Sequence, residues 1–100
     1  MDMKKMMKQA QKMQRDAAAA QAEIAEMEFS ASAGGGMVEA TVMGDMTLKA
    51  VKIDPDAIDP EDMEMVEDMV VAAVNEARRE ASNTSNERMS SLMGGMNLPF

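Results

Sequence analysis

The stretch Gly34-Gly-Gly-Met-Val-Glu-Ala-Thr-Val-Met-Gly-Asp45 decides the fold that this sequence predicts. From Met37 to Met43, apolar and polar residues largely alternate, which is the pattern of a half-buried strand. The glycine triplet Gly34–Gly36 favours a hairpin turn ahead of this strand, and Gly44-Asp45 is a two-residue hairpin signal behind it. We therefore expect a central strand with a tight turn at each end.

Two further strands are predicted beside the central one. Residues 29–33 precede the glycine triplet, and residues 46–53 follow the second turn until Asp54-Pro55 ends the strand pattern. Three short strands joined by tight turns form a small antiparallel meander. Such a sheet is marginal in water by itself, so we expect one of its faces to be covered.

A long helix is predicted ahead of the sheet. Residues 2–28 contain no Gly or Pro and consist mainly of good helix formers. Their apolar residues fall at the a and d positions of four heptads, as in a coiled-coil seam: Met3, Met6, Ala10, Met13, Ala17, Ala20, Ile24 and Met27. We expect this seam to pack on another element, because an isolated helix of this kind would be weak.

A second long helix is predicted behind the sheet. Asp59-Pro60-Glu61-Asp62 has the residues of a helix start, with a capping Asp, a Pro for the first position and acids near the positive end of the helix dipole. Apolar residues at helical spacing then predict one buried face: Val66, Met69, Val70, Ala73, Val74, Ala77 and Ala81. We expect the helix to weaken over residues 82–86 and to end at Gly94-Gly95, with a mobile tail over residues 94–100.

The order of these elements predicts the fold class and the placement of the helices. The chain is expected to be a single α+β domain over residues 1–100, in the order α-β-β-β-α. If the first helix leads into the meander and the second returns from it, the two can pack antiparallel. The start of the first helix would then lie near Arg88 and far from the acidic residues 54–68.

The composition excludes several classes of function. The 100 residues include no Cys or His, so the chain lacks the ligands of an ordinary zinc site, a thiolate nucleophile and the usual general base. The acidic run at 54–64 departs from the calcium-loop pattern, which needs an acid or Asn and then Gly where Ile58 and Asp59 stand. With no signature of a phosphate-binding loop either, we expect no enzymatic activity, no cofactor, no metal and no small-molecule substrate.

The net charge of −8 hides a strong asymmetry along the chain. Residues 1–15 carry five cations and one acid, whereas residues 16–100 carry five cations and seventeen acids. The five early cations all fall away from the apolar seam of the predicted helix: Lys4, Lys5, Lys8, Lys12 and Arg15. Such a stripe could bind phosphates, an anionic membrane or an acidic protein. The seam opposite is needed for packing rather than for lipid, and aromatics for stacking on single strands are almost lacking, which favours backbone contact with duplex DNA.

An alternative of another class stays open at this point, namely an acidic adaptor that binds proteins through its Met-rich helices without DNA. No segment approaches the roughly 18 uninterrupted apolar residues of a membrane span. The charged residues 1–16 also lack the apolar stretch of a signal peptide. We therefore expect the protein in the cytoplasm.

A set of motifs, in order along the whole chain, carries a family resemblance. They are Met7-Lys-Gln-Ala-Gln-Lys-Met13, Gly34-Gly-Gly-Met-Val38, Val51-Lys-Ile-Asp-Pro55, Glu67-Asp-Met-Val-Val-Ala-Ala-Val-Asn75, Glu87-Arg-Met89 and Gly94-Gly-Met-Asn-Leu-Pro-Phe100. Together they resemble the YbaB/EbfC family of bacterial nucleoid-associated proteins. The resemblance implies an α-β-β-β-α fold, a tweezer-shaped homodimer, binding of double-stranded DNA in the nucleoid, and a setting in nucleoid organisation, gene expression or DNA repair.

The resemblance also implies which residues contact DNA. The family uses its first helix and the end of its last helix, which here correspond to Lys4, Lys5, Lys8, Lys12 and Arg15, with Arg78, Arg79 and Arg88 as weaker candidates. The chain begins at the helix, without the short Gly/Lys-rich segment that many relatives carry, so we expect less cationic reach. Residues 82–86 are Ser/Asn-rich where relatives are often richer in charge, so we expect a smaller share of binding from the last helix.

Overall fold

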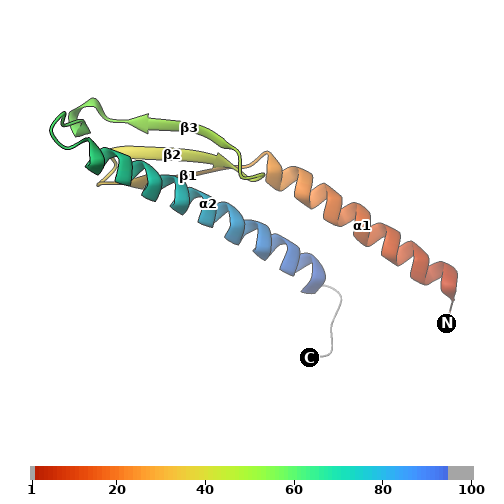
Figure 1. The fold of residues 1–100 in the computed structure, drawn as a ribbon. Coiled ribbons are helices and arrows are strands. Elements are labelled where there is room, and N and C mark those ends of the chain that lie inside the picture. The colour runs from red at the N-terminus through yellow and green to blue at the C-terminus, as the bar shows by residue number, and fades with distance from the viewer. Residues whose placement is uncertain (1, 95–100) are drawn as a thin grey trace.

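The computed structural model describes residues 2–94, which form two long helices joined by a three-stranded sheet (Figure 1). In chain order the elements are α1 (Met3–Ala25), β1 (Glu28–Ala33), β2 (Val38–Met43), β3 (Leu48–Ile53), the short 3-10 helix η1 (Pro55–Ala57) and α2 (Met63–Gly94). The strands form one antiparallel sheet in the order β1-β2-β3. The predicted α-β-β-β-α fold is therefore confirmed. The tail predicted over residues 94–100 lies outside the described residues, apart from Gly94 at the end of α2.

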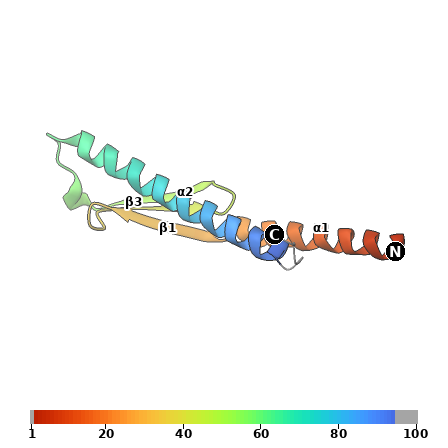
Figure 2. The same cartoon turned by 90° about the horizontal axis from the view of Figure 1, so that it is seen from below.

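The core lies between α2 and the face of the sheet formed by β1 and β2 (Figures 1 and 2). Phe29 of β1 and Val66 of α2 are buried in it, and the side chains with no exposed surface come from two elements: Val38, Ala40 and Val42 from β2, and Ala73, Ala77 and Ala81 from α2. Alanines at helical spacing let the helix backbone approach the sheet closely, and the two larger valines fill the space between them. The apolar face predicted for the second helix is confirmed.

The third strand is less well covered than the other two. Ile53 pairs with Val38 and Leu48 with Val42, so these two side chains of β3 lie on the face of the sheet that α2 covers. Leu48 nevertheless remains 47% exposed and Ile53 39% exposed. The opposite face of the sheet is polar, with a hydrogen bond of 2.8 Å between the hydroxyls of Ser30 and Thr41.

The turn between β2 and β3 differs from the predicted two-residue hairpin. It has three residues, because the N–H of Met43 donates to the carbonyl of Thr47 (2.8 Å) and the N–H of Met46 donates to the carbonyl of Met43 (2.9 Å). The left-handed residue of this longer turn is Met46, at φ 73°, and not Gly44. Hydrogen bonds from the Thr47 hydroxyl and then its backbone N–H lower the pKa of the exposed Asp45 in the same turn.

Gly44 is required by a close contact rather than by its own backbone angle. Its N–H donates to the carbonyl of Met27 (3.0 Å), just past the end of α1. A Cβ at this position would lie 1.7 Å from the carbonyl oxygen of Ile24, far inside contact distance. The β2–β3 turn therefore packs directly against the end of α1, and this contact fixes where α1 leaves the sheet.

The start of α2 also corrects the prediction. The helix begins at Met63 rather than at Pro60, and Asp62 is its capping residue, since its carboxylate accepts the N–H of Met65 (3.3 Å). The carboxylate of Asp59 accepts the N–H of Glu61 (2.9 Å) and closes a separate turn. Asp59 and Asp62 are both suitable capping residues, and the helix begins after Asp62. From there α2 continues unbroken through residues 82–86 to Gly94.

The seam of α1 packs on α2 only in its second half. Ile24 is buried and Ala17 and Ala20 are partly buried, whereas Met3 is 74% exposed and Met6 52% exposed. The prediction that the whole seam packs is therefore wrong for the first turns of the helix. The physical reason is the length of the antiparallel overlap, because α1 extends past the end of α2 (Figure 1). Neither helix within residues 2–94 contains a stretch long and apolar enough to cross a bilayer.

The close contact at Gly44 yields a stability prediction. Gly44→Ala should lower the free energy of unfolding by about 3 kcal/mol, because the added methyl group meets backbone rather than a movable side chain. Gly35→Ala is the matched control, since that position has open space and only a left-handed φ of 68°. We expect it to cost about 1 kcal/mol. Urea unfolding followed by circular dichroism measures both, and equal losses would contradict the role given to the contact.

Candidate nucleic-acid interface

The first half of α1 forms a free-standing arm, defined here as residues 3–16. Every residue of the arm is exposed. Asp2 begins it, because its carboxylate accepts the N–H of Lys4 (3.1 Å) and so caps the helix. The arm projects from the end of the molecule opposite to η1 (Figure 1). A rigid helix that extends into solvent in this way can enter or follow a groove that the compact body cannot reach.

Five cations lie on one side of the arm. They are Lys4, Lys5, Lys8, Lys12 and Arg15, and all five are exposed. At 3.6 residues per turn they fall within an arc of about 100° and extend about 16 Å along the helix axis. None of them forms an ion pair with another of residues 2–94. The structure therefore brings together all the residues that the sequence predicted for the first helix, as one row of unpaired positive charges.

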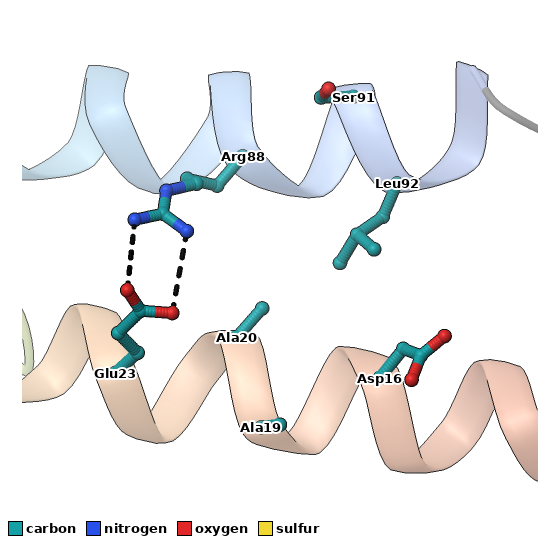
Figure 3. A pocket seen from close by; sticks show the side chains of 7 residues that line it. All are labelled: Asp16, Ala19, Ala20, Glu23, Arg88, Ser91 and Leu92. Carbon is teal, nitrogen blue, oxygen red and sulfur yellow. Dashed lines mark hydrogen bonds and ion pairs between the residues drawn. The ribbon is translucent and has the colours of Figure 1, made fainter.

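Arg88 lies beside the end of α1 and not, as the sequence predicted, beside its start. Its two terminal nitrogens donate to the carboxylate of Glu23 on α1, at 3.2 and 3.4 Å, as the paired dashed lines in Figure 3 show. Glu23 lies near the end of α1, about 28 Å along the helix axis from Lys4. The prediction that the start of α1 lies near Arg88 is therefore wrong, because the first part of α2 lies along the sheet and only its last turns run beside α1. Sequence reasoning missed Glu23, since a pair 65 positions apart leaves no local signal.

The cleft between the two helices is poorly suited to phosphate. Its volume is about 370 Å³, and it is lined by Asp16, Ala19, Ala20, Glu23, Arg88, Ser91 and Leu92. The lining includes two carboxylates, Asp16 and Glu23, but a single guanidinium, which is already paired with Glu23 (Figure 3). A polyanion in this cleft would meet net negative charge, so the arm rather than the cleft is the candidate binding surface.

The two remaining candidates stand apart from the arm. Arg78 and Arg79 are exposed on α2, about 15 Å along that helix from Arg88 toward the sheet. Arg79 forms an ion pair with Glu76 one turn earlier. Nothing in the described chain joins these two arginines to the arm cations, so the eight predicted residues do not form one surface.

The densest acidic run of the chain lies at the other end of the molecule. Residues 54–68 include η1 and the first turns of α2, which lie farthest from the arm (Figure 1). The described chain measures 71 Å along its longest axis, so the two charge groups are separated by several Debye lengths at physiological salt. Within residues 2–94 the acids form no group of three that could hold a metal ion. The molecule is therefore a long dipole with a positive arm and a negative body.

Comparison with known proteins identifies similar chains. A family model described as the YbaB/EbfC DNA-binding family matches residues 1–96. A nucleoid-associated protein of Alkaliphilus metalliredigens is 46% identical over 98 residues, which cover 98% of this chain and 86% of that protein. A protein of the same name from Lachnospira eligens is 53% identical over 76 residues, covering 76% of this chain and 66% of that protein. A third nucleoid-associated protein, from Saccharopolyspora erythraea, is 48% identical over 95 residues, which cover 95% of this chain and 82% of that protein.

A solved structure shares the fold. The crystal structure of uncharacterized protein HP0035 from Helicobacter pylori superimposes with a TM-score of 0.78 and covers 93% of this chain and 98% of that chain, at 18% sequence identity. At this identity the likeness concerns the fold alone. The family model matches residues 1–96 and so includes the arm and both helices. This chain belongs to the YbaB/EbfC DNA-binding family.

Proposed function

We propose that this protein is a non-enzymatic, nucleoid-associated protein that binds duplex DNA through its arm. The observation that carries the proposal is the row of five exposed, unpaired cations on one side of a projecting helix. The family to which the chain belongs and the names of its relatives support DNA as the partner. The relatives' names also support a place at the nucleoid.

Binding through the arm acts mainly on the phosphate backbone. Lysine and arginine neutralise phosphates and release the counterions condensed on DNA, which makes binding strong at low salt and largely independent of sequence. Stacking of bases on aromatic side chains contributes little. Phe29 is the one aromatic residue within 2–94, and it is only 9% exposed because it lies in the core. The acidic body repels DNA and so orients the protein with its arm toward the duplex.

A homodimer would give two arms that straddle a duplex. The partly exposed side chains of β3, Leu48 and Ile53, offer an apolar surface beside the core that a second copy can cover. Covering this surface leaves the arms free at the far end of each copy. Two arms bring ten cations to the DNA, enough to hold it from two sides without any base contact.

The first test of this function is its dependence on salt. If five to ten cations contact phosphates, a plot of log affinity against log salt should have a slope between about −4.5 and −9. Fluorescence polarisation with duplexes of several unrelated sequences, across a salt series, measures the slope and the sequence dependence together. An affinity that stays flat between low and physiological salt would exclude the phosphate mechanism.

A second test assigns the surface. The triple variant Lys4→Glu, Lys5→Glu, Lys8→Glu should lose DNA binding, because it reverses three of the five charges on the exposed arm. The control is Lys52→Glu, which changes an exposed cation of β3 that has no ion-pair partner within residues 2–94. We expect the control to bind DNA within about twofold of the unmodified protein, because this lysine lies away from the proposed contact.

Light scattering on the same variants separates loss of binding from loss of assembly. The unmodified protein and the triple variant should both give twice the chain mass of 10.8 kDa. Unchanged DNA affinity in the triple variant would show that another surface binds DNA.

A third test concerns the pair between the helices. Arg88→Gln should leave DNA affinity nearly unchanged, because the guanidinium is already occupied by Glu23. Glu23→Gln should instead free Arg88 and raise affinity about two- to fivefold, equivalent to one additional phosphate contact at low salt. Gel-shift titrations at a single low salt concentration measure both. A strong loss of binding in Arg88→Gln would mean that Arg88 exchanges Glu23 for phosphate in the complex.

A further inference from the structure

A row of methionines lies on the side of the arm opposite the cations. It is defined here as the methionine stripe and consists of Met3, Met6, Met7, Ala10 and Met13. The exposed fractions are 74% for Met3, 52% for Met6 and 60% for Met7. At 100° per residue, the stripe is centred about 180° from the five cations. The arm therefore has two opposite exposed faces, one positively charged and one apolar.

The stripe is the continuation of a surface that already packs on a helix. In the second half of α1 the same seam lies against α2, through Ala17, Ala20 and the buried Ile24. The covered and uncovered parts meet at Met13, which shares a small cavity of about 80 Å³ with Met89 and Leu92 of α2. Beyond this point no element of residues 2–94 covers the seam. It is a helix-packing surface without its helix.

The charge pattern decides which partner the stripe fits. A membrane-binding helix needs cations beside its apolar face, where they reach the lipid headgroups, but here the cations point directly away from it. Between Met3 and Met13 the stripe is bordered by Gln9 on one side and Gln11 on the other, and neither residue carries a charge. Two copies of the arm can therefore pack stripe against stripe without bringing like charges together, and a heptad seam is complementary to itself.

We propose that the methionine stripe pairs with the stripe of a second copy, arm against arm, when the protein is bound to DNA. The proposal rests on the proposed function, since DNA on the charged face leaves the stripe open on the outer side. In such a pair the two stripes face each other, and the cations of each arm point away from the contact. The pair can therefore hold two duplex segments together, one on each side. The contact spans only about three helical turns, so it is weak in solution and forms where DNA concentrates the arms.

The experiment compares one duplex with two. Binding to a short duplex that accommodates one dimer reports the proposed function alone. Capture of a fluorescent duplex by a second duplex fixed on beads reports bridging. The test variant is Met3→Gln, Met6→Gln, Met7→Gln, because Gln keeps the length and the helix propensity of Met but removes the apolar face. The matched control is Met63→Gln with Met65→Gln, which changes exposed methionines at the far end of the molecule.

The expected result is a selective loss. The test variant should bind the short duplex within about twofold of the unmodified protein and lose bridging by about tenfold or more, whereas the control keeps both. If the test variant binds the short duplex normally and still bridges two duplexes, the inference is wrong but the proposed function stands. An unmodified protein that fails to bridge also overturns it, as does methionine-dependent binding to anionic vesicles in place of bridging. Failure to bind the short duplex overturns the proposed function and the inference with it.

Discussion

The rest of the structure depends on the packing of α2 against the middle strand of the sheet. Val38 and Val42 are fully buried beneath alanines of the helix, and each contributes about 1.5–3 kcal/mol through burial. A three-stranded sheet without this cover would be marginal. Because the helix needs small side chains to approach the strand, Ala73, Ala77 and Ala81 are as necessary to the core as the valines. Once α2 lies along this strand, its direction and its end are fixed.

The position of the arm follows from that arrangement and from one backbone contact. Gly44 presses against the carbonyl of Ile24, so α1 leaves the sheet beside the β2–β3 turn and runs antiparallel to α2. The bidentate pair of Glu23 and Arg88 joins the two helices where they overlap. Past this overlap α1 stands alone in solvent. The core therefore determines both that an arm exists and that it lies at the end of the molecule farthest from the acidic residues.

Separation of charge along a long molecule reconciles a net charge of −8 with a polyanionic partner. A compact protein of this composition would repel DNA over its whole surface. Here the five arm cations extend away from the acidic run at 54–68 by a distance that salt screens, so the arm interacts with phosphate as a local positive surface. The same extension leaves an apolar face of the arm without cover, so methionines stand where a solvated helix would carry polar residues.

Much of this protein is determined by its sequence. Alternation in residues 37–43, the apolar face of the second helix and the row of lysines each follow from local spacing, which the chain keeps in any context that allows a strand or a helix. Only the tertiary structure decided the rest. The seam of α1 reads as one continuous packing surface, yet α2 covers half of it, because overlap depends on where two distant helices begin and end. Arg88 reads as a free cation, yet it lies against Glu23, because ion pairs between elements depend on their relative placement rather than on any local pattern.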